Sequence, residues 1–144
     1  MMLNQFSRTE LLIGKEGIEK LNKAKVAIFG IGGVGSFVVE GLVRAGIQNF
    51  ILVDNDKVAE SNLNRQLLSN VNNLGCLKVN EAVLRAKSIN PDIVVEKYDL
   101  FLDESNIKQL NIRQYDYVFD CCDTVSTKFL LIKKCLDYNI KIIS

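Results

Sequence analysis

The residues best suited to chemistry in this sequence are a glycine-rich turn and a series of charged side chains after it. The turn lies in VAIFGIGGVGS at residues 26–36, where Gly30, Gly32 and Gly35 fit the pattern GxGxxG. In that pattern the first glycine permits a tight turn, the second lets backbone approach a phosphate, and the third lets a helix pack closely on a sheet. The spacing predicts a phosphate at a helix N-terminus, where free N–H groups and the helix dipole favour an anion.

Asp54 ends the next apolar run after the glycine turn. Its separation from the turn is near the value of about 20 residues expected of a carboxylate that binds ribose hydroxyl groups. These two features are equally compatible with NAD and with ATP. The glycines could also serve only to make a tight strand-to-helix turn, so the choice of nucleotide depends on the residues that follow.

Three charged residues favour a triphosphate. A triphosphate needs its negative charge neutralised, and attack on it is catalysed mainly by positioning and electrostatics. Arg65 could supply a planar fork of donors and Lys78 a point charge, while Asp123 could bind magnesium, which prefers carboxylate, phosphate and water oxygens. Each has a simpler alternative, since the two cations could be solvated surface charges and Asp123 could cap a helix that begins near Thr124.

Composition narrows the possible classes of protein. The chain has 144 residues, 18 basic and 17 acidic side chains, and 48% hydrophobic residues, as expected of one globular domain over 1–144. The near-zero net charge gives no support for a polyanion-binding surface. No run is apolar enough to span a membrane, and the N-terminus lacks the apolar stretch of a secretory signal, so we expect a cytoplasmic protein.

Histidine is absent, which excludes an imidazole base and histidine-ligated zinc. The four cysteines form no CxxC pair, so we expect free thiols. The vicinal pair Cys121-Cys122 could transfer sulfur, but small buried residues at a strand end are the favoured interpretation, because no clear thiolate activator lies nearby.

Apolar runs alternate with helix-period segments along the chain, which predicts a doubly wound α/β domain with a mostly parallel sheet of Rossmann-like topology. The polar stretch from 55 to 73 fits neither element and is expected to be an irregular, functional connection. The last predicted strand, 140–143, is followed only by Ser144, and we expect the chain to be the N-terminal part of a longer protein. The predicted strands are 25–30, 49–54, 93–98, 116–120 and 140–143, and the predicted helices are 9–22, 34–45, 75–89, 104–110 and 124–138.

The motifs, taken in order, resemble those of the adenylation domain of the ubiquitin-activating-enzyme superfamily, which includes the ThiF-type sulfur-carrier adenylyltransferases of thiamine and molybdopterin synthesis. Within it, the chain is most similar to the tRNA threonylcarbamoyladenosine dehydratases. Superfamily motifs are GxGGxG at 30–35, DxD at 54–56, SNxxRQ at 61–66, a lysine at 78 and DxxD at 120–123; the dehydratase features are FSRTELLIG at 6–14, Ser36 after the glycines, NxNRQ at 62–66 and DTVSTK at 123–128.

The resemblance implies ATP and magnesium as cofactors, and activation of the threonyl carboxylate of a modified adenosine at tRNA position A37, followed by ring closure with loss of water. It also implies a homodimer, in which Arg8 reaches the ATP of the partner subunit. The implied catalytic residues are Arg65, Lys78 and Asp123, with Asp123 as the magnesium ligand; the implied nucleotide-binding residues are Gly30, Gly32, Gly33, Gly35, Asp54, Asp56, Asn62, Arg65, Lys78 and Arg8.

Two alternatives remain open from the sequence. One is an adenylyltransferase that activates the C-terminal Gly-Gly of a ubiquitin-like sulfur-carrier protein, which would make that protein a partner in place of tRNA. The other is an NAD-binding domain, because the glycine turn and Asp54 alone do not select the nucleotide.

Overall fold

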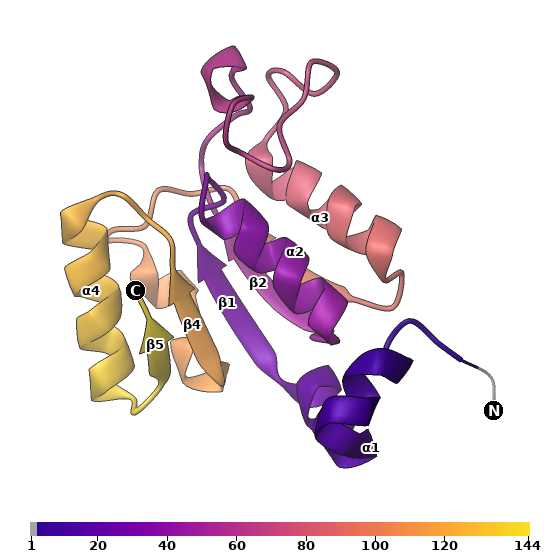
Figure 1. The fold of residues 1–144 in the computed structure, drawn as a ribbon. Helices are drawn as coiled ribbons and strands as arrows, with labels where there is room; N and C mark the ends of the chain where they lie inside the picture. Colours follow the sequence, from indigo (N-terminus) through magenta and orange to yellow (C-terminus); the bar gives the residue numbers. More distant parts are fainter. Residues whose placement is uncertain (1–2) are drawn as a thin grey trace.

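The computed structural model describes residues 3–144 and centres on a five-stranded sheet (Figure 1). Its strands lie in the order β3-β2-β1-β4-β5, and every neighbouring pair is parallel. The order reverses between β1 and β4, which creates a crevice at the carboxyl ends of these two strands, the usual ligand position in such sheets. The five predicted strands are confirmed as β1 (Lys25–Phe29), β2 (Asn49–Val53), β3 (Val94–Tyr98), β4 (Tyr117–Asp120) and β5 (Lys141–Ile143).

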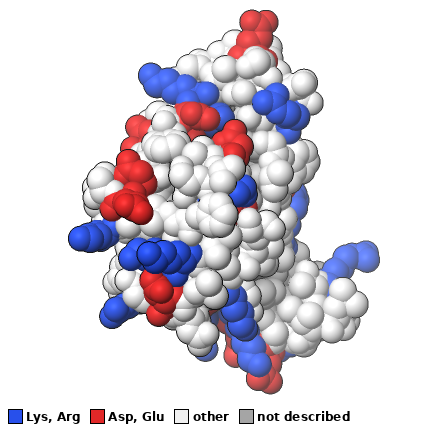
Figure 2. Space-filling view, turned by 90° about the vertical axis from the view of Figure 1, so that its left-hand side faces the viewer, with Lys and Arg blue, Asp and Glu red and all other residues white. Residues whose placement is uncertain are grey.

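Helices cover both faces of the sheet, which confirms the doubly wound arrangement. The helices α2 (Gly35–Ala45) and α3 (Lys78–Ile89) lie on one face, and α4 (Val125–Asp137) lies on the other (Figure 1). On the side of the molecule that carries α4, basic and acidic side chains are interspersed (Figure 2). This mixture agrees with the net charge of +1 and gives that face no continuous positive surface.

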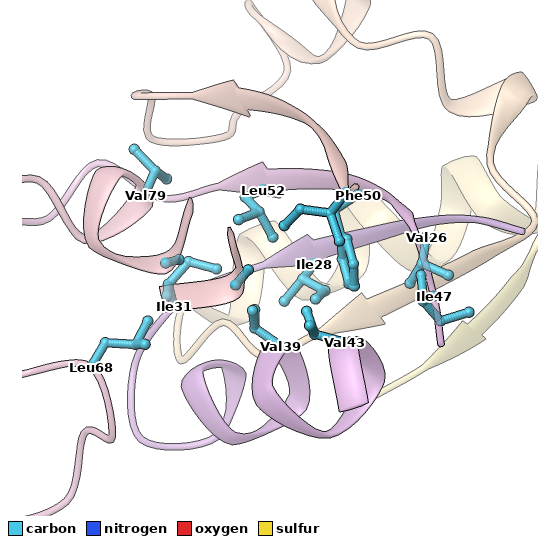
Figure 3. Close-up of a cluster of buried hydrophobic side chains, with 13 residues drawn as sticks. Val26, Ile28, Ile31, Val39, Val43, Ile47, Phe50, Leu52, Leu68 and Val79 are labelled. Atoms are coloured by element: carbon cyan, nitrogen blue, oxygen red, sulfur yellow. The ribbon is translucent and has the colours of Figure 1, made fainter. Parts of the chain in front are cut away.

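Alternating residues of each strand build two separate cores, because successive side chains of a strand point to opposite faces. Val26 and Ile28 of β1 pack with Val39 and Val43 of α2 on one face (Figure 3). On the other face, the intervening residues of β1 pack with Leu131 of α4. The central strands are therefore apolar on both faces, as expected of a parallel sheet between two helical layers.

The helix predicted over 104–110 is wrong. That region contains only the short 3₁₀ turn Ile107–Gln109, and a second 3₁₀ turn, Ile112–Gln114, follows it. Local side chains compete for the backbone there: Asp103 accepts hydrogen bonds from the backbone N–H groups of Ser105 and Asn106, and Asn106 donates to the carbonyl of Phe101. Such bonds offer the backbone an alternative to a helix.

Helix α3 begins at Lys78, three residues later than predicted. Gly75 has a positive φ of 83°, and Leu77 is extended and forms an antiparallel bridge with Lys57. The backbone at Gly75 and Leu77 is therefore not helical and belongs to the connection before α3. The helix ends at Ile89, as expected from Pro91 two residues later, and the stretch from 55 to 73 is irregular as predicted, with one 3₁₀ turn at Glu60–Asn62.

The first helix, α1 (Ser7–Lys23), is interrupted at Gly14, whose φ of 73° and ψ of 170° are not helical. Figure 1 places α1 beside the start of β1, at the end of the sheet opposite the carboxyl ends of the strands. Within residues 3–144, no helix combines the length and apolar character needed to cross a membrane.

Candidate nucleotide-binding site

A cavity of about 730 Å³ opens at the carboxyl ends of the strands, where the strand order reverses. Its volume falls within the range of about 300–1,000 Å³ typical of ligand pockets. The predicted site residues converge on it from segments far apart in the sequence. Those that line it are Gly30, Gly32, Gly33, Asp54, Asp56, Asn62, Arg65, Lys78 and Asp123.

The glycine turn joins β1 to α2 beneath this cavity. Gly30 has a positive φ of 87°, and a Cβ atom there would lie 2.6 Å from the carbonyl oxygen of Cys121. A Cβ at Gly35 would collide with the carbonyl oxygen of Gly30, so both positions require glycine. Gly35 is buried and does not line the cavity, so it acts through close packing, whereas Gly32 and Gly33 line the cavity itself.

Asp54 fixes the glycine turn. One carboxylate oxygen accepts a hydrogen bond of 2.6 Å from the backbone N–H of Ile31, and the other accepts one of 2.6 Å from the N–H of Asp56. Charged acceptors make strong hydrogen bonds of this kind. Each oxygen keeps a further lone pair, so the carboxylate can still accept from ribose hydroxyl groups.

Lys78 is buried, which rules out the alternative that it is a solvated surface charge. Its side chain is 7% exposed, and its Nζ lies 3.0 Å from Oδ2 of Asp56, whose side chain is 62% exposed. The backbone N–H of Lys78 also donates to the carbonyl of Asp56. Asp56 therefore holds the lysine at the cavity wall, where its charge would meet a phosphate.

Arg65 and Asn62 belong to the irregular segment above the glycine turn. Arg65 is exposed, and its Nη1 donates to the carbonyl of Ser61 and to the side-chain oxygen of Asn64. It pairs with no carboxylate of residues 3–144, which leaves most of its donors available to an anion. The side-chain oxygen of Asn62 is already used, since it accepts from the backbone N–H of Ala59.

Asp123 is exposed and lies in the connection between β4 and α4. The alternative that it caps α4 is wrong, because Thr124 occupies the N-cap position and forms no side-chain cap bond. Residues 3–144 contain no group of three metal-binding side chains. Magnesium commonly binds through one or two carboxylates together with phosphate and water oxygens, so Asp123, which has no ion pair among the described residues, fits that mode beside a triphosphate.

Several cavity residues were not predicted from the sequence. Leu100, Phe101 and Leu102 follow β3 and form an apolar part of the wall, with Phe101 50% exposed. Such a surface suits the flat face of a base. No spacing in the sequence marks these residues; the only available signal is that they follow a strand whose carboxyl end borders the crevice. Gln66 and Thr127, both buried, also line the cavity.

A model of the ThiF family matches residues 6–144. The chain belongs to the ThiF family. It is 44% identical to a tRNA threonylcarbamoyladenosine dehydratase of Bacillus subtilis over 143 residues, which is 99% of this chain and 56% of that protein. It is 37% identical to the adenylyltransferase and sulfurtransferase UBA4 of Vanderwaltozyma polyspora, covering all of this chain and 34% of that protein.

Among solved structures, this ThiF-family chain is similar to the tRNA N6-threonylcarbamoyladenosine dehydratase TcdA of Escherichia coli in complex with ATP. The TM-score is 0.92 at 35% identity, and the match covers 96% of this chain and 57% of TcdA. The likeness confirms the Rossmann-like α/β fold. The chain spans about half the length of these dehydratases.

The two vicinal thiols of the ThiF-family chain are held in the protonated form. Burial, and next the negative charge of Asp120, raise the pKa of Cys121 to about 11 and that of Cys122 to about 12, although Lys128 partly opposes the rise. At neutral pH neither thiol has appreciable thiolate character. The finding agrees with the interpretation of these cysteines as small residues of the strand end. The four cysteines are free thiols, as predicted, but Cys76 is exposed.

Arg8 lies far from the cavity of its own chain. It is exposed in the first turn of α1, and α1 lies at the end of the sheet opposite the carboxyl ends of the strands (Figure 1). Arg8 is absent from the residues that line the cavity. Arg8 is therefore not placed to contact a nucleotide in the cavity of its own chain.

Proposed function

We propose that this ThiF-family protein uses ATP to adenylate a carboxylate, and that the carboxylate is the threonyl group of threonylcarbamoyladenosine at position 37 of a tRNA. The observation that carries the proposal is the convergence of Arg65, Lys78 and Asp123 on one cavity beside the glycine turn. Two cations and a carboxylate suit a triphosphate better than a dinucleotide. The named relatives, a dehydratase and an ATP complex of TcdA, support this choice.

The first step is an attack by a carboxylate oxygen of the substrate on the α-phosphorus of ATP. The bond to pyrophosphate breaks, and an acyl adenylate forms, which has a far better leaving group than the original carboxylate. Arg65 and Lys78 stabilise the negative charge that develops on the departing pyrophosphate. Magnesium, held by Asp123, would neutralise further phosphate charge when bound.

The second step needs no nucleophile from the protein. A nitrogen of the same modified nucleoside attacks the activated carbonyl carbon, AMP leaves, and the ring closes. Because attacker and carbonyl belong to one molecule, their effective concentration is high. The mechanism is compatible with a chain that has no histidine and whose vicinal cysteines are protonated.

We further propose a homodimer acting in the cytoplasm, in which Arg8 of one copy contacts the ATP of the other. The position of Arg8 on α1, away from its own cavity, supports a contact in trans.

A second candidate function is adenylation of the C-terminal Gly-Gly of a ubiquitin-like sulfur-carrier protein. The likeness to UBA4 favours that candidate, because UBA4 is itself an adenylyltransferase and sulfurtransferase.

The test begins with ligand binding by the full chain. Calorimetry with magnesium–ATP and with NAD, repeated for Lys78→Ala, should give tighter, magnesium-dependent binding of ATP that weakens in the variant. A preference for NAD would contradict the proposal. Incubation with ATP and tRNA that carries threonylcarbamoyladenosine should then lower the mass of the nucleoside by that of one water, read by mass spectrometry, because a carboxylate oxygen leaves with AMP and the attacking nitrogen gives up its proton. Adenylation of a Gly-Gly protein tail instead would favour the second candidate.

A further inference from the structure

An ion pair between a buried aspartate and a partly exposed lysine, just outside the cavity, ties the segment before α4 to the sheet. Asp120, the last residue of β4, has a side chain with no exposed surface, and its Oδ2 lies 3.0 Å from Nζ of Lys128. The same oxygen accepts a hydrogen bond of 2.7 Å from the hydroxyl of Ser144, and Oδ1 accepts one of 3.1 Å from the backbone N–H of Cys122. One carboxylate thus joins β4, the segment 121–124, the first turns of α4 and the residue after β5.

The segment 121–124 carries Asp123 into the cavity wall. At its start, the N–H of Cys121 donates to the carbonyl of Phe29 over 2.8 Å, and its own carbonyl abuts Gly30 in the glycine turn. At its end, the carbonyl of Thr124 accepts from the backbone N–H of Lys128. Among the described residues, the Asp123 side chain has no hydrogen bond or ion pair of its own, so its place depends on these neighbours.

Lys128 supplies the positive charge that the buried carboxylate of Asp120 needs. A buried carboxylate is costly unless it is paired and hydrogen-bonded. Within residues 3–144, Lys128 is the only cation in ion-pair distance of Asp120. Without Lys128, the negative charge of Asp120 would be unpaired, three residues from Asp123 and beside the site proposed for a triphosphate. The Asp120 carboxylate would then accept hydrogen bonds from other donors of the segment 121–124 and shift that segment.

We propose that Asp120 and Lys128 are positioning residues, which hold the segment 121–124 so that Asp123 can serve the metal and the distal phosphates of ATP. This inference rests on the proposed function. Neither residue lines the cavity, so both act through Asp123 rather than on the nucleotide directly. Outer partners that orient metal ligands typically change metal affinity by about 10- to 100-fold when they are removed.

The test compares magnesium–ATP with AMP as ligands of the full chain. AMP contains the adenine, ribose and α-phosphate but lacks the phosphates that Asp123 and its metal would serve. We expect Lys128→Gln to weaken magnesium–ATP binding by about 10- to 100-fold and to leave AMP binding unchanged. Lys128→Arg keeps the cation and should restore ATP binding, and Lys133→Gln, which removes an exposed lysine of the same helix, is the matched control.

Equal weakening of ATP binding and AMP binding would overturn the positioning role, because a general loss of structure would affect both ligands alike. Unchanged binding of both ligands would overturn it as well. If Lys128→Gln does not fold, the pair Asp120→Asn with Lys128→Gln removes both charges and leaves no unpaired carboxylate. It should show the same selective loss, and wild-type affinity for both ligands would count against the inference. Failure of the wild type to bind ATP would overturn the proposed function and this inference with it, whereas an unaffected Lys128→Gln variant would overturn the inference alone.

Discussion

The side-chain nitrogen of Lys78 lies 3.0 Å from Oδ2 of Asp56, and the lysine is buried while the aspartate is exposed. The pairing orients the lysine from the first turn of α3 toward the segment after β2. A phosphate in the cavity would compete with Asp56 for the same charge, and the exposed carboxylate can be rehydrated at little cost because it already faces water.

Lys78→Ala should therefore weaken magnesium–ATP binding. A hydrogen bond to a charged group is worth about 2 kcal/mol, or roughly 30-fold in Kd. Lys87→Ala, in the exposed last turn of the same helix, is the control and should leave binding unchanged. Calorimetric titration of both variants measures the difference, and equal affinities would show that Lys78 does not contact the nucleotide.

Gly35→Ala should destabilise the fold and abolish the site. Its Cβ would collide with the carbonyl oxygen of Gly30, so the glycine turn and α2 must move apart. Overpacking of this kind costs about 1–3 kcal/mol or more. In the same helix Gly41 has nothing within 4 Å of a Cβ, so Gly41→Ala should instead stabilise by about 1 kcal/mol. Urea unfolding of the two variants should give changes of opposite sign.

Glu40 should make part of the stability depend on pH. Hydrogen bonds from Arg85 are the main cause that lowers the pKa of Glu40 below its usual 4.5; partial burial opposes them, and Arg44 assists. A carboxyl with a lowered folded pKa stabilises the fold above its unfolded pKa, and this stabilisation is lost as the pH falls through the folded pKa.

Glu40→Gln should therefore cost stability at neutral pH, but the difference from the wild type should vanish at an acidic pH below the lowered folded pKa of Glu40. The arginine side chains are 44% and 56% exposed, so the loss should be about 0.5–1 kcal/mol. Urea unfolding at the two pH values checks the prediction, with exposed Glu19→Gln on α1 as the control. A loss that persists in acid would mean that packing, rather than charge, is responsible.

The cysteines should differ sharply in reactivity. Cys76 is exposed, Cys135 is buried, and the raised pKa values of about 11 and about 12 keep Cys121 and Cys122 protonated at neutral pH. Iodoacetamide should therefore alkylate Cys76 first, because only the thiolate is a good nucleophile. Peptide mass spectrometry over time checks the order, and Cys76→Ser should remove the fast phase. Fast alkylation of Cys121 or Cys122 would contradict this prediction and favour a role for these cysteines in sulfur transfer.

The sequence by itself determined the strands, the glycine turn and most of the polar residues that line the cavity. Apolar β-branched runs specify strands locally, and a turn that needs a positive φ and a close backbone approach leaves glycine as the residue at Gly30 and Gly35. These are short-range constraints, so they can be recognised without knowing which segments meet. The parallel order of the strands follows from the crossovers between them, which are helical except between β3 and β4.

Only the tertiary structure decided the environment of each side chain. From the sequence alone Lys78 could be a solvated surface charge, and its burial depends on the packing of α3 beside the segment after β2. The turns in place of the helix expected over 104–110 are a different case, because there Asp103 and Asn106 bond to backbone groups only a few residues away. The apolar wall at Phe101 and the pairing of Asp120 with Lys128 depend on segments that meet across the sheet. Burial and charge pairing come from contacts between distant parts of the chain, so the spacing of residues along the sequence does not predict them.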